Sequence, residues 1–175
     1  MLRFLPILLL FSCAMVSTPE MPTDGGGGDE TAKNKYYSHT DNTKLNVSDA
    51  EWKKILPEGV YYIGREAGTE RAFTGKNYKS KEVGTYYCAV CGNTLFSSDA
   101  KFESGTGWPS FFQPIRKSAV ELKQDNELGM SRTEVVCARC NSHLGHVFDD
   151  GPAPTGERYC MNSAVMDFVA GSAKK

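Results

Sequence analysis

Two pairs of cysteines with the spacing C-x-x-C are the residues of this sequence best suited to bind a metal ion. Cys88 and Cys91 form one pair, and Cys137 and Cys140 form the other. Four thiolates bind Zn²⁺ tetrahedrally, and a site with four protein ligands has no open position for a substrate. The pairs therefore predict one structural Zn²⁺ per chain. Two alternatives stay open: a disulfide within each pair, or a site in which His143 provides the fourth ligand.

Cys160 is the cysteine that this metal site leaves free within the expected folded region. If its segment is a strand, the two-residue period places Arg158, Cys160 and Asn162 on one face. A nearby cation favours the thiolate, which is the nucleophilic form of cysteine. The segment therefore predicts a reactive thiol beside a cation and an amide. The alternative is a buried structural cysteine, because free cysteine is among the most buried residue types.

Two further segments provide side chains that could surround such a thiol. His143 and His146 are two of the three histidines, and imidazole can deliver a proton near neutral pH. Trp108 follows Gly107 and could form an aromatic wall. The alternative for each histidine is a structural role, and the alternative for Trp108 is a place in the core. His39 is assigned no role.

The elements that must position these residues are predicted to be mainly β, with short helices on the N-terminal side. In the segment 47–52, Ser48 as N-cap, Glu51 three residues later and a Val47–Trp52 staple predict the start of a helix, which Pro57 ends. One or two further helical turns are expected in residues 61–67. Mostly antiparallel strands are expected at residues 85–90, 110–115, 119–123, 133–138, 146–148 and 158–169, with a hairpin connection at 125–127.

The N-terminal part of the chain is expected to lie outside this domain. Residues 1–12 carry one cation and a short apolar run that suits a secretory signal. The residues before Cys13 resemble a lipobox, so we expect export to the cell envelope or periplasm with a lipid anchor on Cys13. Ordinary signal cleavage further along, which would remove Cys13, is the alternative. Residues 13–46 predict a flexible tether, residues 47–170 the domain, and residues 171–175 a tail.

Composition argues against some other classes of protein. Hydrophobic residues make up 40% of the 175 residues, which is enough for a core. The formal net charge is −1, so no nucleic acid partner is expected. Two rivals to catalysis by Cys160 stay open: a zinc-ribbon binding module, and a thiol–disulfide oxidoreductase that uses a C-x-x-C pair.

Four motifs together resemble the methionine sulfoxide reductase B family. They are the two C-x-x-C pairs taken as one motif, SGTGWPSF at 104–111, HLGHVFDDGP at 143–152 and RYCMNS at 158–163. The resemblance extends over residues 47–169, including the segment 68–75. It implies two antiparallel β-sheets, a shallow active site and a distal structural Zn²⁺.

The resemblance also implies an activity: thiol-dependent reduction of methionine-R-sulfoxide, mainly protein-bound, through a sulfenic acid on Cys160. His143, His146 and Asn162 would polarise the sulfoxide oxygen, and a histidine would supply the proton. Asp150 would orient a neighbouring histidine or arginine. The catalytic residues implied are Cys160, His143, His146, Asn162 and Arg158, and the substrate-binding residues are Trp108, Phe148 and Asp150.

The sequence departs from much of this family at Thr106, where many members carry a cysteine that resolves the sulfenic acid as a disulfide. We therefore expect an external, thioredoxin-like dithiol to reduce Cys160 directly. The expected partners are this reductant and oxidised proteins that contain methionine-R-sulfoxide. The chain is expected to be a monomer.

Overall fold

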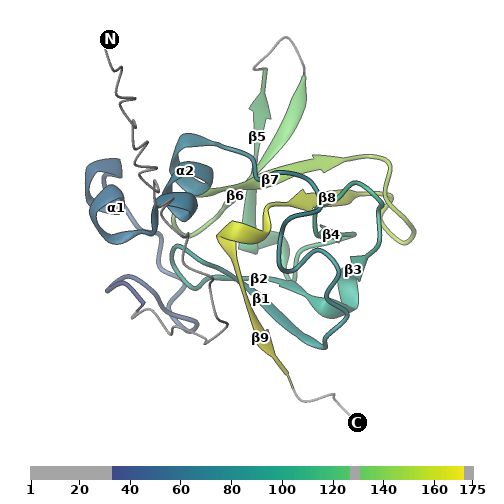
Figure 1. Ribbon diagram of the computed structural model, residues 1–175, viewed down its shortest axis with the longest axis horizontal. Coiled ribbons are helices and arrows are strands. Elements are labelled where there is room, and N and C mark those ends of the chain that lie inside the picture. The colour runs from purple at the N-terminus through teal and green to yellow at the C-terminus, as the bar shows by residue number, and fades with distance from the viewer. Residues whose placement is uncertain (1–32, 127–130, 172–175) are drawn as a thin grey trace, which may run out of the picture. The chain divides into compact units, whose positions relative to one another are not determined.

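The computed structural model describes residues 33–126 and 131–171, and the signal segment, Cys13 and residues 14–32 lie outside them. Two antiparallel sheets dominate the described chain (Figure 1). The smaller has β1 (Gly84–Cys88) between β2 (Thr94–Ser97) and β9 (Met166–Ala170). The larger has six strands, in spatial order β3 (Lys101–Phe102), β4 (Ser110–Phe111), β8 (Arg158–Met161), β7 (His143–Phe148), β6 (Arg132–Cys137) and β5 (Val120–Asp125). The expectation of a mainly β fold with two antiparallel sheets is confirmed.

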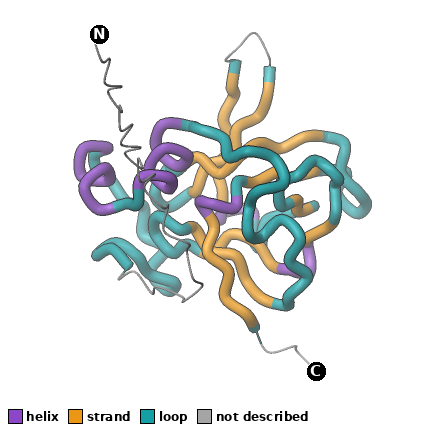
Figure 2. Tube along the Cα trace, in the orientation of Figure 1, coloured by secondary structure: helices purple, strands orange, loops and turns teal. Residues whose placement is uncertain are grey.

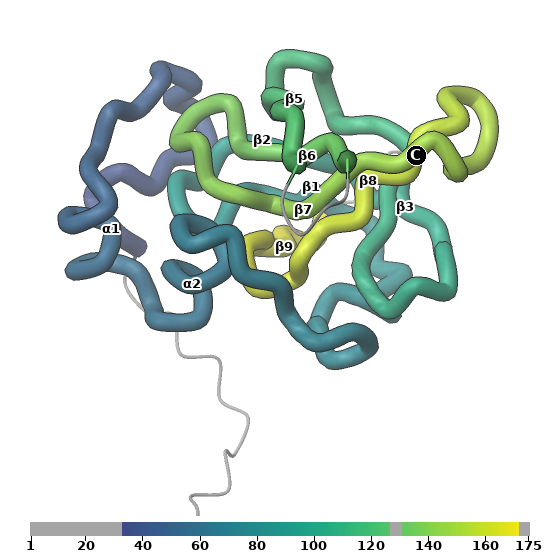
Figure 3. Tube along the Cα trace, turned by 90° about the horizontal axis from the view of Figure 1, so that it is seen from above, coloured from purple at the N-terminus to yellow at the C-terminus, as the bar shows by residue number. Residues whose placement is uncertain are grey.

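Two short helices precede the sheets, as expected. Helix α1 (Asp49–Ile55) begins after Ser48, whose side chain accepts a hydrogen bond from the Glu51 backbone N–H. Helix α2 (Glu58–Glu66) follows Pro57 directly, so it begins three residues before the predicted helical turns. It packs against β7 and a 3-10 turn, and both helices lie at the same end of the larger sheet (Figure 3).

The predicted strand at 158–169 is wrong as one element, because it is two strands in different sheets. β8 belongs to the larger sheet and β9 to the smaller, and the 3-10 turn Ser163–Val165 separates them. The break has a visible cause in the carboxylate of Glu70. Its two oxygens accept hydrogen bonds from the backbone N–H groups of Ser163 and Ala164, at 2.6 and 3.0 Å. Because these two N–H groups bond to the Glu70 side chain, they are not used in strand pairing, and the strand breaks at this point.

Other strand boundaries also differ from the predicted ones. β1 ends at Cys88, because the chain turns there into the first C-x-x-C pair. β4 is only two residues long. β7 begins at His143, three residues before the predicted start. β2 and β3 were not predicted. Residues 67–83, between α2 and β1, contain neither helix nor strand, and much of the described chain is likewise loop (Figure 2). Two further 3-10 turns among the described residues are Ser98–Ala100 and Lys117–Ala119.

Aromatic rings from both sheets fill the core between them. Phe96 of β2 stacks on Phe111 of β4, with ring centroids 4.4 Å apart. Tyr86 of β1 meets Phe111 edge-on at 5.0 Å, and Phe96 also approaches Tyr159 of β8. Tyr86, Phe96 and Phe111 have no exposed surface. This contact fixes the sheet that carries Cys160 against the sheet that carries the first cysteine pair.

Residues 33–46 do not match the predicted flexible tether, because they lie along the folded domain. Tyr36 packs edge-on against the buried Trp52, at 5.2 Å between ring centroids. The backbone N–H of Leu45 donates to the carbonyl of Arg139, and the Arg139 guanidinium donates to the Tyr36 carbonyl and to Asp41. Composition averaged over the whole tether hides these apolar anchors. We call residues 33–46 the N-terminal strap.

Among the described residues, none of the helices has the length and apolar character needed to cross a membrane.

Gly145 of β7 provides a test of the packing beneath the reactive thiol. A Cβ on Gly145 would lie 2.0 Å from the carbonyl oxygen of Cys160, which is backbone and cannot turn away. Gly145→Ala should therefore lower the free energy of unfolding by about 2 kcal/mol or more in urea titration. Gly59→Ala on α2 is the matched control, because a Cβ there meets nothing within 4 Å. Equal stability of the two variants would contradict this account.

Candidate active site and metal centre

Cys160 lies in the middle of the larger sheet, on β8 between β4 and β7. Its cross-strand neighbours are Ser110 on β4 and His146 on β7. The residue is partly exposed, and it lines a cavity of about 150 Å³. This placement contradicts a fully buried structural cysteine. The residues that line the cavity are Thr69, Trp108, Arg132, Gly145, His146, Phe148, Cys160, Met161 and Asn162.

Arg158 is the cation predicted to lie near Cys160, and two residues, Asp150 and Phe148, hold its side chain. Asp150 accepts two hydrogen bonds from the guanidinium, at 2.8 and 2.9 Å, which holds the pKa of that carboxyl below its usual value. The guanidinium also lies over the ring of Phe148, 4.3 Å from the centroid. Asp150 therefore contacts the arginine and not a histidine, and Phe148 both supports Arg158 and lines the cavity.

The thiol of Cys160 is subject to opposing influences. Burial disfavours the thiolate and raises the pKa of Cys160 above its ordinary value, while the hydroxyl of Thr106 and the charge of Arg158 lower it. Burial is the largest of these effects. The free protein therefore holds Cys160 mainly as a thiol near neutral pH, although the sequence pattern suggested a thiolate.

Each predicted histidine is paired with a carboxylate of the same sheet: Glu134 on the adjacent strand β6, or Asp125 on β5, one strand further away. His143 Nδ1 lies 2.7 Å from Glu134, and His146 Nε2 lies 2.8 Å from Asp125. His146 lines the cavity beside Cys160. His143 is 4% exposed and stands behind it, with 5.4 Å between the two ring centroids. Burial lowers the pKa of His143, so this imidazole is neutral at pH 7.

A second, more polar cavity of about 320 Å³ adjoins the first, because Thr69, Arg132 and His146 line both. Glu134 and His143 line only the second. Nε2 of His143 is buried, and no hydrogen-bond partner for it lies among the described residues. With Nδ1 donating to Glu134, Nε2 is an acceptor.

Asn162 and Trp108 are both held by Glu70. Asn162 uses its amide within the fold, donating to the Leu144 carbonyl at 3.1 Å and accepting from the Glu70 N–H at 3.0 Å. The indole N–H of Trp108 donates to the Glu70 carbonyl at 3.1 Å. Trp108 is half-buried on the cavity wall, so it is not a core residue, and its indole is held in place by the Glu70 carbonyl.

Three carboxylates around the site were missed by sequence analysis: Glu70, Asp125 and Glu134. Glu134 had a detectable signal, since it is a charged residue inside a predicted strand near the histidines. Asp125 was assigned only to the hairpin, whose strands β5 and β6 pair as expected, while residues 127–130 lie outside the described chain. Glu70 had no local signal, because its partners lie about 90 residues away in sequence.

The four paired cysteines form one buried cluster, in which all four Sγ atoms lie within 4.8 Å of one another. Sγ of Cys88 is 3.7 Å from that of Cys140, and Sγ of Cys91 is 3.6 Å from that of Cys137. Zn–S bonds of about 2.3 Å in a tetrahedron place sulfurs roughly 3.8 Å apart, so the donor set fits a metal ion. None of these four cysteines is in a disulfide. The ring of His143 is bonded to Glu134 and is not part of the cluster.

Turns and an arginine hold the two cysteine pairs in place. The N–H of Gly92 donates to the Cys88 carbonyl, and the N–H of Asn141 donates to the Cys137 carbonyl. Both turn residues have left-handed backbone, with φ of 78° and 59°. The buried guanidinium of Arg139 donates to the Cys91 carbonyl and to the N-terminal strap. The strap therefore braces both pairs.

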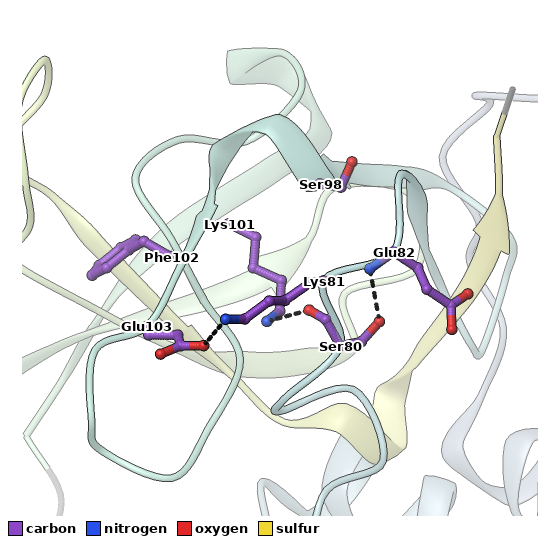
Figure 4. A pocket seen from close by; sticks show the side chains of 7 residues that line it. All are labelled: Ser80, Lys81, Glu82, Ser98, Lys101, Phe102 and Glu103. Atoms are coloured by element: carbon purple, nitrogen blue, oxygen red, sulfur yellow. Dashed lines mark hydrogen bonds and ion pairs between the residues drawn. The ribbon is translucent and has the colours of Figure 1, made fainter. Parts of the chain in front are cut away.

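A separate pocket near β3 is lined by none of the predicted site residues (Figure 4). Its two lysines are already bonded. Lys81 forms an ion pair with Glu103 at 3.1 Å, and Lys101 donates to the carbonyls of Tyr78 and Ser80. The pocket therefore offers no free cation for a ligand. The cavity beside Cys160 is the better candidate for catalysis.

A partly buried thiol, an adjacent histidine–carboxylate pair and a distant cluster of four cysteines that could hold a metal ion are the features of a thiol-dependent oxidoreductase with a possible metal site. The SelR domain family matches residues 56–170. The chain belongs to the SelR family, whose relatives here are named peptide methionine sulfoxide reductase MsrB.

Three of these MsrB relatives illustrate how much of the chain is shared. The protein of Leptospira interrogans is 56% identical over 127 residues, which cover 73% of this chain and 97% of the relative. The protein of Methanosarcina barkeri is 60% identical over 124 residues, or 71% and 87%. The protein of Acinetobacter baumannii is 55% identical over 123 residues, or 70% and 88%. The family resemblance predicted from the motifs is confirmed.

The pH dependence of Cys160 alkylation tests the electrostatics of the site. Because its pKa is raised, the alkylation rate should reach half of its maximum above pH 8.5, which is about where an ordinary thiol is half ionised. Arg158→Met removes the nearby cation and should move the profile to higher pH. The measurement is iodoacetamide labelling followed by mass spectrometry of the Cys160 peptide. A plateau already reached at pH 7 would contradict the dominance of burial.

Proposed function

We propose that this protein reduces methionine-R-sulfoxide in oxidised proteins to methionine, with Cys160 as the nucleophile. The observation that carries the proposal is the partly exposed thiol of Cys160 in a cavity lined by Trp108 and His146. The similarity to MsrB proteins supports the same substrate class. The biological role is then the repair of oxidised proteins, which is a defence against oxidative stress.

The chemistry requires one thiolate and one proton per substrate. The Cys160 thiolate attacks the sulfoxide sulfur, the sulfoxide oxygen takes a proton, and this oxygen ends on Cys160 as methionine leaves. The substrate sulfur gains two electrons, and the Cys160 sulfur loses two and becomes a sulfenic acid. The indole of Trp108 is placed to pack against the substrate methyl group.

His146 is the proposed proton donor, because it lines the cavity and is the cross-strand neighbour of Cys160. Asp125 orients its ring. His143 is buried behind His146, so its proposed contribution is to support that ring and to complete the polar surroundings. The amide of Asn162 lines the same cavity and faces the sulfoxide oxygen in this proposal.

The activity is tested by dithiothreitol-driven reduction of separated R and S epimers of a methionine sulfoxide peptide. The R epimer should be reduced and the S epimer left unchanged. Cys160→Ser should abolish turnover while the melting temperature stays near that of the wild type, since the site is not core. Turnover retained in Cys160→Ser, or reduction of the S epimer alone, would refute the proposal.

A second variant isolates the proton-transfer step. His146→Gln should slow the formation of sulfenic acid in a single turnover by roughly 10²- to 10⁴-fold, which is the usual contribution of general acid catalysis. The melting temperature is the control for folding. An unchanged single-turnover rate in a stable variant would remove His146 from the mechanism.

We also propose that the four-thiol cluster holds one structural Zn²⁺ through Cys88, Cys91, Cys137 and Cys140. The sulfur separations fit tetrahedral coordination, and four protein ligands leave no open position for catalysis. When bound, the ion would supply only the cross-link between the two pairs.

Metal analysis and thermal unfolding test this site. One equivalent of zinc should co-purify, and a strong chelator should lower the melting temperature. Cys137→Ser should lose zinc and aggregate, whereas Cys160→Ser is the matched control and should keep a full equivalent. Active protein without zinc, with both pairs oxidised, would rule the site out.

For recycling, we propose an external thioredoxin-like dithiol. The four clustered thiols are committed to the metal in this proposal, and Thr106 faces Cys160 where a resolving cysteine would otherwise stand. One turnover without reductant should then leave a sulfenic acid that dimedone traps. A disulfide within the chain would contradict direct external reduction.

For localisation, we propose export to the cell envelope with a lipid anchor on Cys13. The apolar run at 4–11 and the lipobox-like residues before Cys13 support this, and both lie outside the described residues. Cys13→Ala should move the protein from the membrane fraction to the soluble fraction. A wild-type protein found only in the soluble fraction would refute the anchor. We propose a monomer as the working state.

A further inference from the structure

A chain of three hydroxyl groups ends at the sulfur of Cys160. The hydroxyl of Thr106 lies 3.8 Å from Cys160 Sγ and 2.9 Å from the hydroxyl of Ser104. The hydroxyl of Ser104 lies 2.7 Å from that of Ser110, which donates to the backbone carbonyl of Trp108 at 3.2 Å. Sulfur, three hydroxyls and a carbonyl are thus connected, and the Ser110 hydroxyl also acts on the Cys160 thiol directly. The mechanism above uses none of the three hydroxyls.

The carbonyl at the far end fixes the direction of every hydrogen bond in this chain. The Trp108 carbonyl can only accept, and each hydroxyl has a single hydrogen to donate. Ser110 donates to Trp108, so Ser104 must donate to Ser110. Thr106 must then donate to Ser104. The hydrogen left for the last link is that of the Cys160 thiol, which therefore donates to Thr106.

Loss of the Cys160 proton reverses this last link. A thiolate can only accept, so Thr106 must turn its hydrogen from Ser104 to the sulfur. Ser104 is not stranded by this change, because its oxygen already lies 3.4 Å from the backbone N–H of Thr106. Hydrogen bonds to a charged group are stronger than those between neutral groups, which favours the turned state once the thiolate exists.

The loop that carries Thr106 is built to hold it in this place. Gly105 and Gly107 on either side have φ of 75° and 96°, values that other residues rarely adopt. Ser110 is fully buried and is the cross-strand partner of Cys160. The positions of both ends of the hydroxyl chain are therefore set by backbone geometry and not by flexible side chains.

We propose that Thr106 is a catalytic residue of this enzyme, whose hydroxyl accepts from the Cys160 thiol and turns to donate to the thiolate, with Ser104 and Ser110 as positioning residues. This inference rests on the proposed role of Cys160 as nucleophile. In this proposal, the hydrogen bonds among Ser104, Thr106 and Ser110 determine how readily Cys160 loses its proton. The Thr106 hydroxyl favours the thiolate, since it lowers the pKa of Cys160 and so opposes the effect of burial.

Charged groups around Cys160 must stay constant in a test of this proposal, and neutral substitutions in the hydroxyl chain leave them in place. The titratable and charged side chains that face or adjoin the cavity are Arg158 on β8, His143 and His146 on β7, Arg132 and Glu134 on β6, Asp125 on β5, Asp150 beyond Arg158, and Glu70, whose carboxylate binds the turn after β8.

The decisive comparison is Thr106→Val against Thr106→Ser in the full chain. Valine has the shape of threonine without the hydroxyl, so alkylation of Cys160 by iodoacetamide at neutral pH should slow about tenfold, as expected for one lost hydrogen bond to a charged group. Thr106→Ser keeps the hydroxyl and should stay close to the wild-type rate. Equal rates for valine and wild type, or for valine and serine, would overturn the proposal.

Ser104→Ala should change the rate of Cys160 alkylation in the opposite direction to Thr106→Val. Without Ser104 as its acceptor, Thr106 has its hydrogen free for the sulfur, so alkylation of Cys160 at neutral pH should become faster and its pH profile should move to lower pH. A purely structural role for this loop predicts slowing in both Ser104→Ala and Thr106→Val. Slowing in Ser104→Ala with an unchanged melting temperature would therefore also overturn the proposal.

These measurements separate the inference from the proposed function. Alkylation needs no sulfoxide, so a failure of the epimer assay would leave the alkylation comparison valid as a statement about the thiol. Conversely, normal reduction of the R epimer with equal alkylation rates in all variants would keep the function and remove Thr106 from it. In a single turnover, sulfenic acid should form faster in Thr106→Ser than in Thr106→Val.

Discussion

The contact among four thiols is the constraint on which the rest of the structure depends. Cys88 ends β1 of the smaller sheet, and Cys137 ends β6 of the larger sheet, so the cluster ties one sheet to the other at a single point. The stacked rings of Phe96 and Phe111 continue this junction through the core. Because both sheets are fixed, β8 is held between β4 and β7, and this placement determines which side chains surround the sulfur of Cys160.

A second constraint acts locally, through Glu70. Its carboxylate binds the 3-10 turn after β8, its N–H binds Asn162, and its carbonyl binds the indole of Trp108. One loop residue thus sets the end of β8 and two walls of the cavity beside Cys160. Because burial makes unpaired polar groups costly, these bonds also explain why an irregular loop keeps a defined path.

The sequence allowed the parts of this arrangement that depend on local spacing to be predicted. The cysteine pairs, the Ser48 cap and the face shared by Arg158 and Cys160 follow from short periods, and each has its counterpart in the structure. The division of residues 158–170 between two sheets could not be predicted, since its cause is Glu70, far away in the chain. The strap was missed for a related reason, because Tyr36 finds its partner Trp52 only after folding.

The attachment of the N-terminal strap has a mechanical consequence. Lys33 and Tyr37 both bond to Asp167 on β9, and Arg139 holds the strap against the cysteine pairs. A pull on residue 33 would load these bonds first, and Arg139 would pass part of it to the second cysteine pair. The hairpin of β7 and β8, where the thiol lies, is not part of that path. Such a pull would reach Cys160 indirectly, through β9 and the 3-10 turn that follows β8.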